Sequence, residues 1–140
     1  MEMKDMLLIL FPIIAGIVSS YITYYFAIKS KKNEAILEFK EEKYANLVVL
    51  LQGFTGKTAS GDTKRKFLEE QRKSWLYCSD EVIKAVNNML ILFVEKENRL
   101  IDNEKAKEAI GNIIVAIRKD LLGKTKLDYT DFSYFDVIDR

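Results

Sequence analysis

The sequence contains no histidine, and it has only one cysteine, Cys78, and one proline, Pro12. Without histidine the chain cannot form His-dependent catalytic triads, imidazole metal ligands or a histidine pH switch. A single cysteine excludes an intramolecular disulfide and is typical of a reducing compartment. Because proline interrupts helices, the absence of any proline after Pro12 leaves the rest of the chain free to be helical.

A strong net charge is also lacking, since 22 basic residues face 21 acidic ones and leave a net charge of +1. Such a chain has no overall field that would attract nucleic acid or acidic substrates, so nucleic acid is not an expected partner. Paired catalytic carboxylates and metal-ligand spacings are missing from the sequence as well. We therefore expect no enzymatic activity, no metal and no cofactor.

What the sequence does contain is an uncharged apolar segment, residues 6–28. At ~1.5 Å per residue, a helix of this length crosses a ~30 Å hydrocarbon core. A secretory signal peptide would instead have a basic start, a shorter apolar run and a small-residue cleavage site. Residues 1–28 are therefore predicted to be an uncleaved anchor that crosses the cell membrane once, with the lipid bilayer as its partner.

The flanks of this segment predict its orientation. Three lysines follow it closely, whereas the first five residues carry one lysine and two acids. Basic residues favour the cytoplasmic side, so the chain after residue 28 is predicted to be cytoplasmic. Tyrosine rings near the same end of the segment are typical of the headgroup region. The predicted membrane-interface anchors are Tyr24, Tyr25, Lys29, Lys31 and Lys32.

Small or weakly polar residues recur along the span at Pro12, Gly16, Ser20, Thr23 and Ala27. Steps of three and four keep them near one helical face, where small side chains let neighbouring helices approach closely. We interpret the last four as a surface for helix association, which predicts a homo-oligomer. Two alternatives stay open: in a lone helix the hydroxyls bond to their own i−4 carbonyls, or Ser20 and Thr23 line a pore.

The part after the span is predicted to be all-α, a bundle of about four helices. Residues 29–52 contain no glycine or proline, so the membrane helix is predicted to continue through them as a stalk and first bundle helix. Residues 53–140 would form the rest of the bundle, beginning with a loop at 53–62 that holds three glycines. Its GKT triplet is not a Walker A motif, because that motif requires glycine where Leu51 stands.

The helix after this loop is predicted over residues 63–78, with Asp62 or Thr63 as its N-cap. The residues at helical spacing, which would form its apolar face, are Phe67, Leu68, Trp75 and Cys78. Basic side chains gather in and near its first part. They are predicted to contact lipid headgroups or a small anionic ligand, although such a run is also typical of a solvated face. These residues are Lys57, Lys64, Arg65, Lys66, Arg72 and Lys73.

Two more helices and a short C-terminal one complete the predicted bundle. Ser79 is a predicted N-cap for the third helix, and Asp102 for a fourth over Asn103 to Leu122. Gly123 is predicted to end that fourth helix as its C′ residue. Thr130 is predicted to cap a short aromatic helix that docks on the bundle through Phe132, Phe135 and Ile138.

Two segments carry a resemblance, WLYCSDEVIKAVNNML at 75–90 and AIGNIIVAIRKDLLGKTKL at 109–127. They resemble small prokaryotic proteins with one N-terminal span and a cytoplasmic helical domain, and the resemblance covers the chain from Leu51 onward. It implies an anchor with a helical domain, and it implies no catalytic residue and no substrate. Some single-span effectors of prokaryotic antiviral systems share this layout, which is an analogy of architecture.

These observations favour a membrane-anchored interaction or scaffold protein that associates with itself or with another membrane or cytoplasmic protein. The alternative is a ligand-gated membrane effector, in which the basic residues between Lys57 and Lys73 sense an anionic nucleotide and the small-residue face of the span rearranges.

Overall fold

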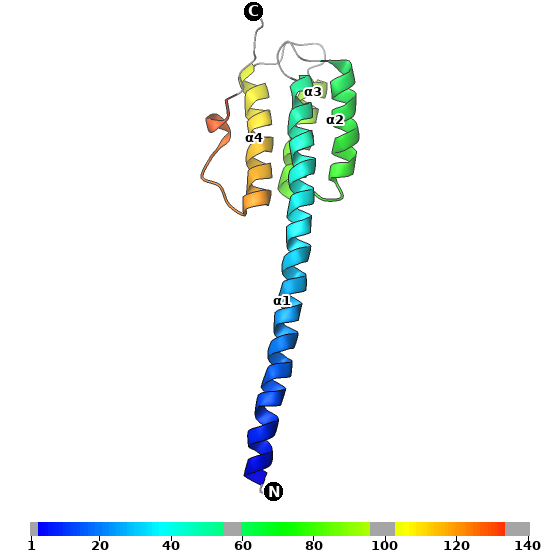
Figure 1. The fold of residues 1–140 in the computed structure, drawn as a ribbon. Helices are drawn as coiled ribbons and strands as arrows, with labels where there is room; N and C mark the ends of the chain where they lie inside the picture. Colours follow the sequence, from blue (N-terminus) through cyan, green and yellow to red (C-terminus); the bar gives the residue numbers. More distant parts are fainter. Residues whose placement is uncertain (1–2, 55–59, 96–102, 134–140) are drawn as a thin grey trace, which may run out of the picture. The chain divides into compact units, whose positions relative to one another are not determined.

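The computed structural model describes residues 3–54, 60–95 and 103–133. Within these ranges all regular structure is helical, which confirms the all-α prediction and its four helices (Figure 1). The elements are α1 (Met3–Leu50), the 3₁₀ helix η1 (Leu51–Phe54), α2 (Gly61–Ser74), α3 (Asp80–Glu95), α4 (Asn103–Leu122) and the 3₁₀ helix η3 (Tyr129–Asp131).

The chain forms two compact units, Met1–Glu38 and Phe39–Arg140. The described part of the first unit, residues 3–38, belongs to helix α1, and the side chains of these residues are all exposed. Among the described helices, α1 is the one that is long and apolar enough to cross a membrane. An N-terminal signal sequence would meet the same criteria.

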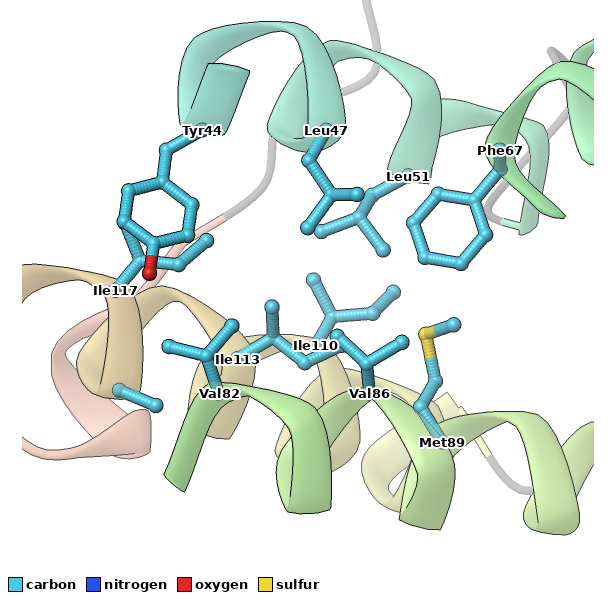
Figure 2. Packing of buried hydrophobic residues seen from close by; sticks show 11 residues of the cluster. Tyr44, Leu47, Leu51, Phe67, Val82, Val86, Met89, Ile110, Ile113 and Ile117 are labelled. Carbon is cyan, nitrogen blue, oxygen red and sulfur yellow. The ribbon is translucent and has the colours of Figure 1, made fainter. Parts of the chain in front are cut away.

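The second unit is a small helical bundle built on the last turns of α1 (Figure 1). Its core is contiguous: α1 with η1, α3 and α4 contribute to it at steps of three or four residues, and α2 contributes Phe67, as Figure 2 shows. Burial of each large apolar side chain stabilises the fold by roughly 1.5–3 kcal/mol. The buried apolar residues are Tyr44, Leu47, Leu51, Phe67, Val82, Val86, Met89, Ile110, Ile113, Ala116 and Ile117.

Helix α2 differs from its prediction at both ends. Its N-cap is Ser60, whose Oγ accepts a hydrogen bond from the Thr63 amide at 3.1 Å, so neither Asp62 nor Thr63 caps it. It ends at Ser74, where two amides, those of Tyr77 and Cys78, turn back onto the Ser74 carbonyl. Because the helix stops there, the apolar face predicted to extend to residue 78 is broken.

The ends of α3 and α4 follow the sequence more closely. The Ser79 carbonyl accepts a hydrogen bond from the Ile83 amide at 3.1 Å, which places Ser79 directly before α3. Gly123 follows α4 with φ of +77°, in the left-handed region that favours glycine, so the predicted C′ residue is confirmed. The predicted N-cap Asp102 lies outside the described residues.

The C-terminal tail is capped two residues earlier than predicted. Asp128, and not Thr130, is the N-cap of η3: its carboxylate accepts from the Thr130 amide at 2.7 Å, while Asp131 accepts from the Asp128 amide at 2.9 Å. Phe132 packs against the core. The other two predicted docking residues, Phe135 and Ile138, lie outside the described residues.

Candidate functional site

The small-residue stripe of the first unit lies on helix α1, with all four of its proposed contact residues exposed. A Cβ added at Gly16 would meet nothing within 4 Å. The Thr23 hydroxyl donates to the Ser19 carbonyl at 2.9 Å, which is the i−4 bond expected of a lone helix. Thr23 therefore has its proton engaged within α1, and its hydroxyl oxygen still has acceptor capacity for a neighbour. The stripe is Gly16, Ser20, Thr23 and Ala27.

The predicted membrane-interface residues are also exposed along α1. The Tyr25 and Phe26 rings meet edge to face with their centroids 5.9 Å apart. Tyr24 is exposed as well, so this stretch presents several aromatic surfaces with a polar tip on each tyrosine. The three lysines beyond it, Lys29, Lys31 and Lys32, are exposed and lie on the same helix.

In the second unit the aromatic contacts define two ends. At one of them Phe54 of η1 meets Phe67 of α2 and Phe93 of α3 edge to face, with centroid distances of 5.0 and 5.2 Å. The Lys64 ammonium lies 5.7 Å from the centroid of the Phe54 ring. We call this the Phe54 end, and it comprises η1, the start of α2 and the end of α3.

The other end of the second unit lies around Phe39, its first residue. The Phe39 and Tyr77 rings meet there at 5.5 Å, and a Lys40–Asp120 ion pair of 2.9 Å joins α1 to α4. A second ion pair, Lys119–Glu81 at 2.9 Å, joins α4 to the first turn of α3. We call this the Phe39 end, and it comprises Phe39, the turn 74–78, the start of α3 and the end of α4, as the directions of the helices in Figure 1 show.

The basic residues predicted as one contact surface are divided between these two ends. Lys64 to Lys66 lie in the first turns of α2 at the Phe54 end, and Arg72 and Lys73 lie in its last turn at the Phe39 end. Between Lys66 and Arg72 the helix rises by ~9 Å. Two of these cations already form ion pairs: Lys66 with Asp62, and Lys73 with Glu70. Lys57 lies outside the described residues, so the structure gathers no common anion site from this set.

A polar cluster at the Phe39 end joins α1 to α4 (Tyr44 is labelled in Figure 2). The Tyr44 hydroxyl donates to Asp120 Oδ2 at 2.5 Å, and the Lys40 ammonium donates to the same oxygen at 2.9 Å. Burial, and then the hydrogen bond to Asp120, hold the pKa of Tyr44 far above its usual value. The sequence did not reveal this cluster, although Tyr44 stands three residues before Leu47 on the same face.

Two further polar side chains lie against this cluster. Burial raises the pKa of the half-buried Cys78 thiol, and the hydroxyls of Tyr44 and Ser74 oppose that rise. Burial, followed by the neighbouring Cys78 and Glu70, raises the pKa of Tyr77 to about 12. The Tyr77 hydroxyl is buried without a hydrogen-bond partner among the described residues. The raised pKa leaves less of the Cys78 thiol in the reactive thiolate form.

The outer face between α3 and α4 carries a shallow groove. Ala85, Ala109 and Ala116 line it, together with the ion-paired Glu81 and Lys119. It lacks a buried, convergent polar group that would fix the orientation of a small ligand. Within 3–54, 60–95 and 103–133, no group of three or more His, Cys, Asp or Glu residues could hold a metal ion.

The sequence interpretation also placed Trp75 on one helical apolar face with Phe67, Leu68 and Cys78, and the structure separates these residues. Phe67 is fully buried and Cys78 half-buried, whereas Trp75 is 59% exposed. Helix α2 ends at Ser74, so helical spacing does not predict which side chains after it share a face with Phe67. The family resemblance of the soluble segments stays a prediction. Comparison of the chain with protein-family models, with curated proteins and with solved structures finds no match.

Proposed function

We propose that this chain is a single-pass membrane protein whose cytoplasmic helical unit is an interaction module, and that it associates with itself through α1. One observation carries the proposal: the apolar part of α1 is exposed along its whole length, with none of it buried inside the fold. Soluble monomers rarely expose continuous apolar surface of this extent, because each Å² left in water costs about 25 cal/mol. A bilayer covers such a helix on every side.

The composition of the two ends of this segment supports one orientation. The exposed lysines lie on its C-terminal side, next to the tyrosines that prefer headgroups. In the proposed arrangement the second unit lies in the cytoplasm, where its single thiol stays reduced. Helix α1 extends from the apolar segment to Leu50, and its last turns contribute Tyr44 and Leu47 to the core of the second unit.

Self-association is supported by the exposed small-residue stripe. Gly16 has open space around its missing Cβ, so a neighbouring helix can approach the backbone there. Ser20 and the acceptor side of Thr23 offer polar contacts to that neighbour. The proposed assembly is therefore a homo-oligomer held by its spans.

The alternative, a ligand-gated effector that senses an anionic nucleotide, requires several cations to converge on one ligand. The described cations of that set are divided between the Phe54 end and the Phe39 end, and two of them are paired with carboxylates. This distribution favours the interaction module over the sensor.

The proposal is tested with one engineered cysteine. Gly61 is exposed, and a side chain added there meets nothing within 4 Å, so Gly61→Cys in a Cys78→Ala background presents a single accessible thiol. In intact cells we expect the protein in the alkaline-resistant membrane fraction, with this thiol labelled by an impermeant maleimide only after lysis. Recovery in the soluble fraction, or a mature N-terminus beyond residue 28, would show that α1 is a signal sequence instead. Labelling of unlysed cells would reverse the orientation.

A further inference from the structure

We infer that the second unit pairs with the same unit of a second copy through the outer surface of α3 and α4. We call this surface the α3–α4 face. It comprises the groove lined by Ala85, Ala109 and Ala116 and the exposed side chains on the two rims of that groove. The pairing rests on the proposed function, which makes this unit an interaction module, and it names the partner of that module.

The two rims of the groove have a fixed register. Helices α3 and α4 are antiparallel, as Figure 1 shows, and the 2.9 Å ion pair between Glu81 and Lys119 joins the start of α3 to the end of α4. Asn88 follows Glu81 by seven residues, and Asn112 precedes Lys119 by seven. Seven residues are about two helical turns. The two asparagines, which both line the groove, therefore lie at the same level on opposite rims.

These asparagines have unused hydrogen-bonding capacity. Both are exposed, and neither makes a side-chain hydrogen bond among the described residues, whereas the neighbouring Asn87 accepts from Gln71 at 3.3 Å. A side-chain amide both donates and accepts, so two facing asparagines satisfy each other. Asparagine at a helix interface specifies the partner and its register. In a two-fold symmetric contact, Asn88 of each copy meets Asn112 of the other.

The charges of the α3–α4 face favour a second copy over a strongly charged partner. Acids and lysines occur on it in nearly equal number, so it has no field of one sign that would attract an anionic surface or nucleic acid. A surface that pairs with itself needs both signs of charge. The acids are Asp80, Glu81, Glu104 and Glu108. The lysines are Lys84, Lys105 and Lys119.

The positions of these charges select one of two symmetric arrangements. When the second copy is turned about an axis parallel to the helices, each α3 lies over the other copy's α4 at the same level, and Glu81 meets Lys119. Both side chains are more than half exposed, so each is open to a further partner. When the second copy is turned end over end at the level of Asn112, Lys119 meets Lys105, which stands seven residues before Asn112. Like charges in contact are destabilising, so the first arrangement is favoured.

The apolar contacts of this arrangement are modest. Ile91, which is 53% exposed, lies opposite Ala109 of the second copy, because each is ten residues from the Glu81–Lys119 level. Lys84 lies opposite Val115, where its methylene stem covers apolar surface while the ammonium stays in water. A small, partly polar contact of this kind is weak by itself. Copies joined through α1 belong to one assembly, and a contact between tethered units needs little intrinsic affinity.

Crosslinking between two distinguishable copies tests the arrangement. One full-length copy carries Asn88→Cys, and a copy with a longer tag carries Asn112→Cys, both in membranes and in a Cys78→Ala background. A short bis-maleimide should join them in a product of mixed size. Two copies that both carry Asn88→Cys, or both Asn112→Cys, should crosslink several-fold less, because those positions are not opposed. Asn88→Cys with Gly61→Cys, an exposed position on α2, is the collision control.

A charge swap tests the contact while each copy keeps its own ion pair. Glu81→Lys with Lys119→Glu reverses that pair and preserves it within each copy. Two swapped copies should crosslink through the same cysteines as well as two parent copies do. A swapped copy beside a parent copy places like charges together at both contacts, so their product should fall roughly fivefold. An equal yield would overturn the pairing, and circular dichroism checks that the swapped copy keeps its helices.

The outcomes separate this pairing from the association of α1, which Ser20→Cys reports from the small-residue stripe. If Ser20→Cys crosslinks but the product of Asn88→Cys with Asn112→Cys does not exceed the Gly61→Cys control, the pairing is wrong and the association of α1 stands. If the mixed product forms and Ser20→Cys does not crosslink, the pairing stands and the association of α1 is wrong. If neither forms, both are wrong.

Discussion

The hydroxyl of Tyr44 donates a hydrogen bond to the carboxylate of Asp120, which lies 76 residues further along the chain. The acceptor oxygen also receives the Lys40 ammonium, so one carboxylate of α4 holds two side chains of α1. Tyr44 is fully buried, and its ring packs among the core side chains while its hydroxyl reaches the polar cluster. This contact holds the last turns of α1, from Lys40 onward, against α4 within the second unit.

Removing the Tyr44 hydroxyl tests how strongly this contact stabilises the unit. Tyr44→Phe keeps the ring and deletes one hydrogen bond to a charged acceptor, so we expect the free energy of unfolding to fall by about 1.5–3 kcal/mol. Urea unfolding of the full-length protein in detergent, followed by circular dichroism, measures the change. Tyr129→Phe is the control and should stay within about 0.5 kcal/mol of the parent. Equal stability of the two variants would contradict the prediction.

The free energy of unfolding should decrease in alkaline solution because of the ionisation of Tyr44. In the folded state the pKa of Tyr44 is held above its ordinary value of about 10, so the unfolded chain releases this proton first and binds fewer protons at high pH. Stability is therefore complete below pH ~10 and falls above it, by about 1.4 kcal/mol per pH unit for Tyr44. Unfolding at several alkaline pH values measures the slope. In Tyr44→Phe the slope should become shallower, and an unchanged slope would assign it to other groups.

Local signals in the sequence predicted several elements correctly, because they depend on neighbouring residues. Gly123 ends α4 where a left-handed residue is needed, and the lack of breakers after Ala27 predicted a continuous α1. The ends of α2 were predicted less well. Ser60, three residues before Thr63, competes with other cap candidates nearby, and no glycine or proline marks the stop at Ser74.

The arrangement of side chains in the second unit could not be predicted, because it depends on contacts between distant residues. The Tyr44–Asp120 pair has no local signature, since each residue alone is compatible with a solvated helix face. The basic residues are close together in sequence, yet the rise of α2 places Lys64 and Arg72 at different ends of the unit. Exposure of Trp75 follows from where α2 stops, which spacing alone does not reveal.

Gly111 should not tolerate a larger side chain. A Cβ at this position in α4 would lie 2.9 Å from the Tyr129 Cβ and 3.0 Å from the Tyr129 carbonyl oxygen, so η3 would have to move. We expect Gly111→Ala to destabilise the unit by about 1–3 kcal/mol, offset by up to ~1 kcal/mol of helix propensity. Hydrogen exchange of residues 127–133 should accelerate as the segment detaches.

Gly61→Ala is the matched control for this experiment. Position 61 is the first residue of α2, and an added Cβ meets nothing within 4 Å. Its stability should equal or slightly exceed that of the parent. If Gly111→Ala behaves in the same way, the close approach of η3 to α4 does not constrain the native fold.

Bulkier residues on the small face of α1 should weaken self-association. The double change Gly16→Leu and Ser20→Leu fills the proposed interface while keeping the segment apolar enough for insertion. Because a single interhelical polar contact contributes about 0.6 kcal/mol, the double change is the fair test. Crosslinking in membranes measures the oligomer, and Ile17→Leu with Ile22→Leu is the off-face control. Crosslinking that survives the Gly16 and Ser20 changes would assign any assembly to the cytoplasmic helices.

The half-buried Cys78 is a native reporter of local opening of the turn between α2 and α3. A thiol reagent attacks the thiolate, and burial keeps this thiol both protonated and partly covered, so reaction proceeds through transient opening of the turn between α2 and α3. When reclosing is faster than attack, the labelling rate is proportional to the fraction of molecules that are open. A partner that binds this turn and stabilises it will slow the labelling of Cys78. A partner that separates the turn from α1 will accelerate the labelling, and neither measurement needs an engineered probe.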